Sequence, residues 1–321
     1  MIKKQIKKIL PFFDIFLLPL VYPAALLMKT VRRIGMTNLP RSRNALLKVG
    51  VFPIRYHYYE PQFDNRNLNF SDSSNRSLPG INWNIEGQLS FLSFLKFSEE
   101  VMRIPHEKRF EGCEEFYLNN GSFESGDAEY WYQIIRYIKP RKIIEVGSGN
   151  STKVAMQAIK KNVEDDSSYR CKHMCIEPYE QTWLEDSAVE LYRKKVEEID
   201  TEFFLQLESG DVLFIDSSHI IRPDGDILKE QLEIFPSLKS GVIVHIHDIF
   251  SPKHYLCKWL LEDVKFWNEQ YLLEAFLTHN NDWKVLGALN YLHHNHYLEL
   301  KKVAPHLNKH REPGSFYMVK K

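Results

Sequence analysis

The sequence predicts an α/β protein built around a doubly wound sheet of mostly parallel strands. Three observations indicate this fold. After Pro140, short apolar runs alternate with segments of helical spacing, as strands joined by crossover helices do. The runs are apolar on consecutive residues, as parallel strands buried on both faces require. A glycine-rich turn, EVGSGNST at residues 145–152, ends the first run and opens the first helix.

The alternation assigns strands and helices in order along the second half of the chain. We expect strands at 142–147, 173–178, 195–199, 211–216 and 241–248, and a closing pair at 283–292 and 315–321. Helices are expected between them at 151–162, 183–194, 202–208 and 225–235. Ligands of such sheets bind beyond the carboxyl ends of the strands, so functional residues are expected directly after these runs.

Residues 44–125 are expected to form an extension that caps the substrate site. The run at 60–80 is dense in Asn, Ser, Asp and Pro, which favour turns. A helical pattern begins at Phe91, and a second helix begins near Asp127, whose carboxylate can cap it. The aromatic stretch at 55–63 is expected to pack in the core, and a place beside the substrate pocket is the alternative.

The composition bounds the partners and the compartment. The 321 residues carry 42 Lys and Arg and 42 Asp and Glu, which excludes a strongly basic nucleic-acid binder and an acidic disordered chain. Residues 1–43 nevertheless hold nine basic side chains against one acid, Asp14. Four cysteines are too few for a disulfide scaffold, so we expect reduced thiols in a cytoplasmic protein.

Residues 9–28 form the most apolar window, about as long as the roughly 20 residues that span a bilayer. Asp14 and three prolines are expected to interrupt a spanning helix, and basic residues flank the window on both sides. We therefore expect residues 1–43 to lie on, or dip into, the anionic inner face of the plasma membrane. A true span is one alternative, and packing on the domain or in a homo-oligomer is another.

The glycine-rich turn can hold an anionic group of a ligand. Gly147 and Gly149 let the backbone turn tightly and approach a ligand closely. Asn150 or Ser151 can cap the following helix, whose free N–H groups attract a carboxylate. Thr152 stands where a dinucleotide fingerprint has its third glycine, which disfavours a nicotinamide dinucleotide.

Ionisable residues follow three further strands. Glu177 ends the second run, where a carboxylate can accept hydrogen bonds from two ribose hydroxyls. Asp216 and Asp248 end the fourth and fifth runs, which we expect to be neighbours, and two converging carboxylates suit Mg²⁺. His219 has the intrinsic pKa of a general base. A loop-fixing role for Asp216 and a helix-capping role for Asp248 are the alternatives.

These motifs resemble class I S-adenosylmethionine-dependent methyltransferases. The similarity lies in E-x-G-x-G after the first strand, the acid that ends the second, and the run IDSSHIIRPDGDILKEQLEIFPSLKSGVIVHIHDIFSPKHY (215–255), and it covers about residues 117–321. That run is similar to a bacterial branch of small-molecule and sugar O-methyltransferases and cephalosporin-hydroxylase-like proteins. The resemblance implies a Rossmann-like methyltransferase sheet over residues 126–321, with seven strands, the last pair antiparallel, and an N-terminal extension.

The resemblance also implies roles for individual residues. The residues implied to line the methionine moiety of S-adenosylmethionine are Glu145, Gly147, Ser148, Gly149 and Ser151. Glu177 would hold the ribose. Asp216 and Asp248 would bind a divalent cation such as Mg²⁺, and His219 would remove the proton of the acceptor hydroxyl. Related metal sites place an acid where this chain has His247, which suits Mg²⁺ poorly.

The leading hypothesis is an O-methyltransferase that acts on a sugar or glycan-linked hydroxyl in polysaccharide biosynthesis at the bacterial membrane. A non-catalytic membrane-associated scaffold of the same fold is one alternative. A metal-dependent hydroxylase-like enzyme is another, although no facial triad of two histidines and one carboxylate is evident from the spacing. His293, His294 and His296 are expected in a solvated loop rather than in a zinc site.

Overall fold

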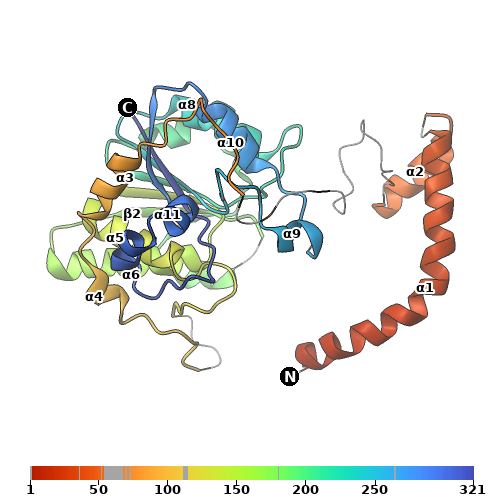
Figure 1. The fold of residues 1–321 in the computed structure, drawn as a ribbon, viewed down its shortest axis with the longest axis horizontal. Coiled ribbons are helices and arrows are strands. Elements are labelled where there is room, and N and C mark those ends of the chain that lie inside the picture. The colour runs from red at the N-terminus through yellow and green to blue at the C-terminus, as the bar shows by residue number, and fades with distance from the viewer. Residues whose placement is uncertain are drawn as a thin grey trace. The chain divides into compact units, whose positions relative to one another are not determined.

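The computed structural model describes residues 2–321 except 36, 52, 54–67, 69, 70, 72, 73, 111–114, 180 and 264, and of residues 2–12 it describes the backbone only. The predicted aromatic stretch at 55–63 and Cys113 therefore lie outside the described residues. The chain divides into two compact units, Met1–Asn69 and Phe70–Lys321. Each unit is described by itself below (Figure 1).

The first unit is helical. Helix α1 runs from Ile2 to Ile34 and α2 from Pro40 to Val49. The interruption predicted within residues 9–28 is wrong, because α1 continues past all three prolines. Each proline removes one N–H donor, but the turns on either side keep their own hydrogen bonds.

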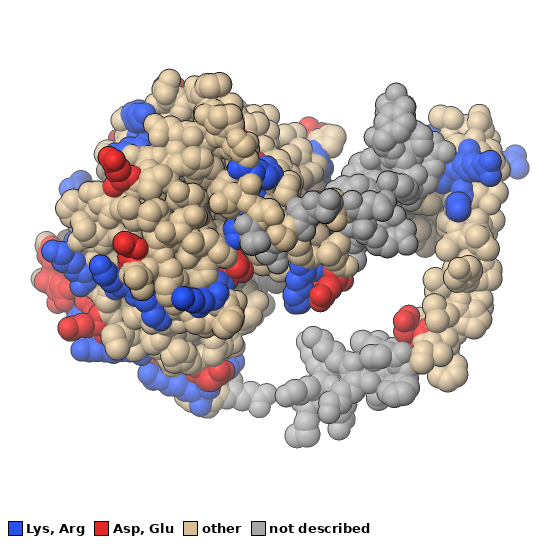
Figure 2. Space-filling model, in the orientation of Figure 1, with Lys and Arg blue, Asp and Glu red and all other residues tan. Residues whose placement is uncertain are grey.

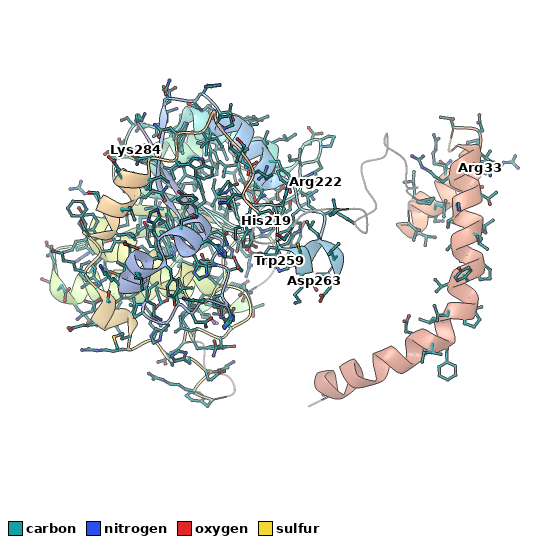
Figure 3. All side chains as sticks on the ribbon, in the orientation of Figure 1. Arg33, His219, Arg222, Trp259, Asp263 and Lys284 are labelled. Carbon is teal, nitrogen blue, oxygen red and sulfur yellow. The ribbon has the colours of Figure 1, made fainter. Side chains whose placement is uncertain are left out.

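Helix α1 presents an apolar surface to its surroundings. The part from Phe13 to Ile34 is long and apolar enough to cross a membrane, by length and composition alone. Its large side chains are exposed, including Phe16 and Leu20. Figure 2 shows this largely uncharged surface, with basic side chains at the C-terminal end of α1, where Figure 3 labels Arg33.

The second unit is a three-layer α/β/α sandwich around a seven-stranded sheet. Its strands are β1 Lys142–Val146, β2 Lys172–Ile176, β3 Glu190–Tyr192, β4 Val212–Ile215, β5 Ile243–Ile246, β6 Trp283–Ala288 and β7 Phe316–Lys320. They lie in the order β3-β2-β1-β4-β5-β7-β6. The pairs from β3 to β5 are parallel, and β7 runs antiparallel to β5 and β6. The predicted doubly wound sheet with a closing antiparallel pair is confirmed.

Helices cover both faces of the sheet. On one face lie α3 Ile85–Leu92, α4 Ser98–Val101, α5 Asp127–Ile138, α6 Asn150–Asp165, α11 Leu289–Asn295 and α12 Tyr297–Val303. The other face is covered by the 3-10 helices η3 Val196–Glu198 and η4 Thr201–Gln206, a continuous helical stretch α7–η5–α8 over Asp226–Ser237, and α10 Glu269–Leu277. The short helices η2 Thr182–Asp186 and α9 Cys257–Leu261 complete the set described.

Each strand contributes side chains to two cores. Ile143 and Val212 belong to the cluster under α5 and α6, whereas Ile144 and Leu213 belong to the cluster on the opposite face. All four are fully buried. Successive strand residues point to opposite faces, so a strand covered on both sides must be apolar at every position. This explains the uninterrupted apolar runs of the sequence.

The edge of the sheet beside β2 differs from the prediction. The third strand is β3 rather than residues 195–199, which hold η3 instead. Val196 and Ile199 are both buried, and a three-residue spacing on one side is the period of a 3-10 helix. The helix predicted at 183–194 is reduced to η2, because β3 occupies the end of that range.

Four other expectations need correction. The helical pattern from Phe91 is divided between α3 and α4, and the helix at 202–208 is the 3-10 helix η4. The strand predicted at 283–292 ends at Ala288, where α11 begins. His293 therefore lies in a helix and is buried, not in a solvated loop. Its position follows from α11 packing on the sheet.

Asp127 is the first residue of α5 but does not cap it. Its carboxylate instead accepts hydrogen bonds from the backbone N–H groups of Gly314 (3.2 Å) and Ser315 (2.7 Å). The N-terminal turn of α5 is closed by Glu129, whose side chain accepts a hydrogen bond from the N–H of Gly126. Asp127 thus connects α5 to the segment that leads into β7.

Candidate functional site

A cleft of about 640 Å³ lies at the carboxyl ends of the central strands. Three of its lining residues each follow a strand directly or within one residue: Gly147 after β1, Glu177 after β2 and Asp216 after β4. The remaining wall comes from the η3 segment and from the loop that carries Arg222. This is the edge at which a doubly wound sheet binds its ligands.

The turn after β1 lies directly against the end of β4. Gly147 has a φ of +79°, and a Cβ atom there would lie 1.9 Å from the carbonyl oxygen of Asp216. The N–H of Asp216 donates to the carbonyl of Val146 at 2.8 Å. Only glycine fits both the backbone angle and the space. The floor of the cleft is therefore bare backbone.

Glu177 is oriented by backbone groups at the rim of the cleft. Its Oε1 accepts a hydrogen bond from the N–H of Tyr179 (3.1 Å) and its Oε2 one from the N–H of Ser148 (3.2 Å). Each carboxylate oxygen can accept a further hydrogen bond. Glu177 can thus bind hydroxyl groups of a ligand, as the sequence predicts for a ribose.

The other predicted cofactor residues lie outside the lining of the cleft. Glu145 is fully buried, where it accepts a hydrogen bond from the hydroxyl of Thr152 and lies 3.3 Å from Nε2 of His173. The N–H of Gly149 donates to the same Thr152 hydroxyl. The predicted side-chain cap by Asn150 or Ser151 is wrong, because Gly149 itself is the N-cap residue of α6. Ser148 and Ser151 are buried. Glu145 therefore stabilises the glycine-rich turn through its hydrogen bond with Thr152.

Next to the cleft, four ionisable side chains meet after β4 and β5. Nε2 of His219 lies 3.3 Å from Oδ1 of Asp216 and 3.6 Å from Oδ2 of Asp248. Nδ1 of His247 lies 3.4 Å from Oδ1 of Asp216 and 3.6 Å from Oδ1 of Asp248. The predicted convergence of Asp216 and Asp248 is observed, and His219 and His247 join them. We call these four residues the His-Asp cluster.

The backbone of the His-Asp cluster is held in an uncommon conformation. His219 has a φ of +60° and Asp248 a φ of +59°, in the left-handed region that favours glycine. The carbonyl of His219 accepts hydrogen bonds from the N–H groups of Asn268 and Glu269, which fix it. Such strain is concentrated at functional sites, where the surrounding structure must hold it in place.

The charges of the cluster stabilise one another. Burial disfavours the charged form of His219, but its hydrogen bonds to Asp216 and Glu269 outweigh burial and hold the pKa of His219 well above its usual range. Burial acts likewise on His247, whose pKa is held high by Asp248 and Asp216. Burial also raises the pKa of Asp248, whereas the two imidazoles overcome it at Asp216 and lower the pKa of that carboxyl. The cluster can hold protons or a cation.

Three residues that contact the cluster are not predicted from the sequence as site residues. Glu269 of α10 accepts a hydrogen bond from Nδ1 of His219 at 2.8 Å, and Trp267 packs on the same ring at a centroid distance of 4.2 Å. Asp127 of α5 lies 3.7 Å from Nε2 of His247. They come from elements far from β4 and β5 in sequence, and no local motif marks them. Figure 3 labels His219, the residue that Glu269 and Trp267 contact.

The cluster also brings together two histidines and two carboxylates, a set that the residue spacing did not reveal. Three of the four, Asp216, His219 and Asp248, offer one ligand atom each within 4.8 Å of one another. His245 contributes to a different environment, because its Nε2 lies 2.9 Å from the Ser315 hydroxyl. Its burial lowers the pKa of His245, in contrast to its neighbour.

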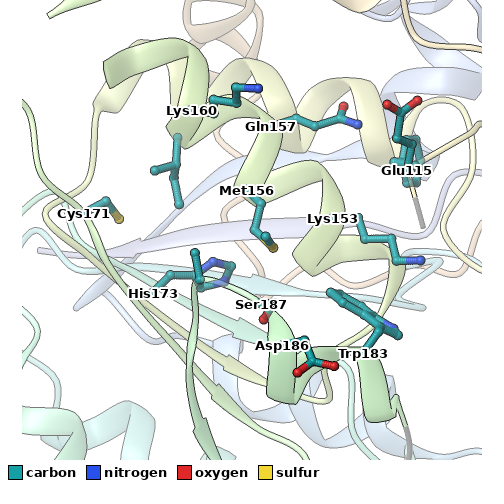
Figure 4. Close-up of a pocket in the computed structure, with 13 residues that line it drawn as sticks. Glu115, Lys153, Met156, Gln157, Lys160, Cys171, His173, Trp183, Asp186 and Ser187 are labelled. Atoms are coloured by element: carbon teal, nitrogen blue, oxygen red, sulfur yellow. The ribbon is translucent and has the colours of Figure 1, made fainter. Parts of the chain in front are cut away.

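A second, larger pocket of about 810 Å³ lies beside α6 (Figure 4). Met156 and Trp183 contribute to its mostly apolar wall, and Lys153 and Lys160 belong to its lining. Among the residues that the structure describes, none lines both this pocket and the cleft. The two pockets are therefore separate, and Asp216 joins the cleft to the His-Asp cluster.

Comparison with known proteins gives one family and several distant similarities. Residues 144–249 match the family model described as a methyltransferase domain. An uncharacterized protein of Archaeoglobus fulgidus is 28% identical over 165 residues, which cover 48% of this chain and 73% of the relative.

Two solved structures are similar at low identity. The plantazolicin methyltransferase BpumL in complex with SAH has 11% identity and a TM-score of 0.34, with 61% of this chain and 82% of that chain covered. CalS11, described as a TDP-rhamnose 3'-O-methyltransferase of calicheamicin biosynthesis, has 14% identity and a TM-score of 0.34, with 60% and 76% covered. Similarity this distant adds nothing to the observed strand order and the family match.

Replacing Gly147 by alanine should remove both stability and ligand binding. We expect a loss of about 3 kcal/mol in the free energy of unfolding, since the new Cβ meets the Asp216 carbonyl and the backbone angle is strained. Binding of S-adenosylhomocysteine should fall more than tenfold. Urea unfolding and titration calorimetry measure the two effects.

Gly121→Ala is the matched control for this substitution. Gly121 has a φ of +84° but nothing within 4 Å of its added Cβ, so only the strain of about 1 kcal/mol is expected. Equal losses for the two variants would show that the close approach to Asp216 is unimportant.

Proposed function

We propose that this chain methylates a hydroxyl oxygen of a sugar or glycan-linked acceptor. The premise is that residues 144–249 lie in a class I S-adenosylmethionine-dependent methyltransferase domain. The single observation that supports oxygen as the acceptor atom is the position of His219. It lies in the His-Asp cluster, and Asp216 belongs both to this cluster and to the lining of the cleft. A base beside a donor site suits the removal of a hydroxyl proton.

The cleft has the size and chemistry to hold the donor. Its volume of about 640 Å³ is within the range of small-molecule sites, roughly 300–1,000 Å³. The bare backbone at Gly147 lets a ligand approach closely, and Glu177 can accept hydrogen bonds from ribose hydroxyls. S-adenosylmethionine supplies an electrophilic methyl group on a sulfonium. Glu145 supports this arrangement indirectly, through Thr152 and the turn above it.

His219 is arranged as a base with an oriented ring. Its Nδ1–H donates to the buried Glu269, so a ring that has lost its Nε2 proton can accept the proton of the acceptor hydroxyl at Nε2. Because Asp216 and Glu269 hold the pKa of His219 high, this neutral form, and with it turnover, is favoured as the pH rises. Asp216 and Asp248 face Nε2 and stabilise the imidazolium that forms. Glu269 acts through His219 and is a positioning residue. The contact pattern is that of a base held by a third group, as in hydrolytic triads.

A divalent cation is the second proposed component of the site. Asp216 and Asp248 face the same space, and their side chains are partly exposed, at 34% and 16%. A cation held by these carboxylates would lower the pKa of a bound hydroxyl. The donor set fits such an ion, because hard oxygen ligands are paired at one point.

The surroundings of His219 support a sugar as the acceptor. Trp267 packs on its imidazole, and Trp259 lies 5.1 Å from Trp267 between ring centroids. Both indoles are partly exposed. Nζ of Lys265 lies over both rings, 4.3 and 4.4 Å from their centroids, so a sugar ring would contact the indole surface that Lys265 leaves exposed. The residues that choose the acceptor are therefore expected in the segment around α9.

A hydroxylase-like enzyme is the second candidate. His219, His247 and one carboxylate of the cluster match the donor set of non-haem iron oxygenases. Oxygen consumption that depends on Fe²⁺ and yields a hydroxylated product would favour this activity over methyl transfer.

We further propose that residues 1–43 hold the protein at an anionic membrane surface. The exposed apolar surface of α1 needs an apolar environment, and the basic residues at its C-terminal end suit lipid head groups. A membrane-bound enzyme would meet a lipid-linked glycan acceptor there.

His219→Gln should abolish turnover without weakening the binding of the methyl donor. We expect transfer of labelled methyl from S-adenosylmethionine to fall about 10²- to 10⁴-fold, because Gln cannot take up the proton. Affinity for S-adenosylhomocysteine should stay within about threefold, since His219 is not part of the cleft lining. The acceptor is found first, by a screen of sugar nucleotides and lipid-linked sugars with added divalent cations. The exposed His310→Gln variant is the control. Full turnover by His219→Gln would exclude His219 as the general base.

Deletion of residues 1–43 should move the protein from the membrane fraction to the soluble fraction. The apolar surface of α1 and nine of the basic side chains are lost together. Fractionation of cells that express the full and shortened chains measures the effect. A wash at high salt that leaves the full chain on the membrane assigns the binding to the apolar surface. Retention of the shortened chain would contradict the role given to this segment.

A further inference from the structure

We propose that His247 is a third protein ligand, with Asp216 and Asp248, of a divalent transition metal, and that Asp127 orients its ring. The inference rests on the cation of the proposed function but not on methyl transfer. It assigns a role to the histidine that stands where an acid was expected from the resemblance, and it changes the metal class from Mg²⁺.

The inner nitrogen of His247 points at the two carboxylates. Nδ1 lies 3.4 Å from Oδ1 of Asp216 and 3.6 Å from Oδ1 of Asp248. Metal bonds of about 2.0–2.1 Å at tetrahedral angles place donor atoms roughly 3.4 Å apart. The distances from Nδ1 to the two carboxylate oxygens are therefore close to those between donor atoms that share one ion.

Nδ1 of His247 also lacks a hydrogen bond. It is buried, and within the described part of the chain it has no partner at hydrogen-bond geometry, while the residue as a whole is 4% exposed. Its nearest acceptors, the carboxylates of Asp216 and Asp248, lie 3.4 and 3.6 Å away and outside hydrogen-bond geometry. An ion between His247, Asp216 and Asp248 would supply the missing partner.

The outer nitrogen of His247 faces a fixed carboxylate. Nε2 lies 3.7 Å from Oδ2 of Asp127, and Asp127 is held by the N–H groups of Gly314 and Ser315. The ring of Phe123 packs against the imidazole at a centroid distance of 5.0 Å. Histidines that bind metals usually have such a carboxylate behind the ligating ring, because it sets the tautomer and the ring orientation.

The donor set predicts the class of metal. Two carboxylates and one imidazole suit Mn²⁺, Fe²⁺, Co²⁺ or Zn²⁺. Mg²⁺ prefers oxygen ligands throughout. His219 faces the same two carboxylates through Nε2, at 3.3 and 3.6 Å, but that nitrogen is the base of the proposed function. The variants below separate the two roles.

Metal binding to the full chain tests this proposal without donor, acceptor or turnover. The protein is stripped with a chelator and titrated with Zn²⁺, Co²⁺ and Mg²⁺ by calorimetry, and the Co²⁺ form is followed by its visible absorption. We expect one equivalent of Zn²⁺ or Co²⁺ and an affinity for Mg²⁺ that is lower by about 100-fold or more. Equal or tighter binding of Mg²⁺ by the unaltered protein would overturn the proposal, and this result needs no variant.

Variants assign the ligand. His247→Asn should lower Co²⁺ affinity about 100-fold, Asp127→Asn about tenfold, and His247→Asp should shift preference toward Mg²⁺. The exposed His310→Asn variant is the control and should leave Co²⁺ affinity unchanged, and circular dichroism confirms the fold of each variant. Binding kept by His247→Asn and lost by His219→Asn would overturn the assignment. Metal binding without methyl transfer would leave this inference standing and remove only the proposed function.

Discussion

The close approach of Gly147 to the carbonyl of Asp216 is the contact on which the site depends. No side chain fits between the first turn and the end of β4, so the cleft floor is backbone and its position is fixed by the sheet. Asp216 belongs both to the cleft and to the His-Asp cluster. Its main chain closes the cleft, and its carboxylate faces His219 and His247. A shift of this one residue would alter ligand space and charge together.

The His-Asp cluster is stable because every buried charge has an opposite charge nearby. One ring nitrogen of each imidazole faces Asp216 and Asp248. The other ring nitrogen faces Glu269 in His219 and Asp127 in His247. Breaking one member of such a set leaves an uncompensated buried charge, which destabilises a fold strongly. The arrangement also explains the left-handed backbone at two of its residues, which neighbouring elements hold in place.

Much of this fold follows from local pattern. Runs of apolar residues locate five of the seven strands closely, and the rule that ligands bind after parallel strands predicts that Asp216 and Asp248 converge. The edge strand β3 was missed because three residues carry too little pattern. Glu269 and Asp127 were missed as site residues because helix packing over long sequence distance, which no spacing reveals, places them. The continuity of α1 shows that prolines weaken a helix without always ending it.

The central claim is that the donor occupies the cleft beside the His-Asp cluster, rather than the larger apolar pocket beside α6. Hydrogen exchange of the full chain with and without S-adenosylhomocysteine tests it most directly. The ligand should slow exchange at the backbone amides of residues 146–148, 177–179 and 216–218, which surround the cleft. Slowing confined to residues 153–160 and 183–188, around the other pocket, or no slowing at all, would contradict the account.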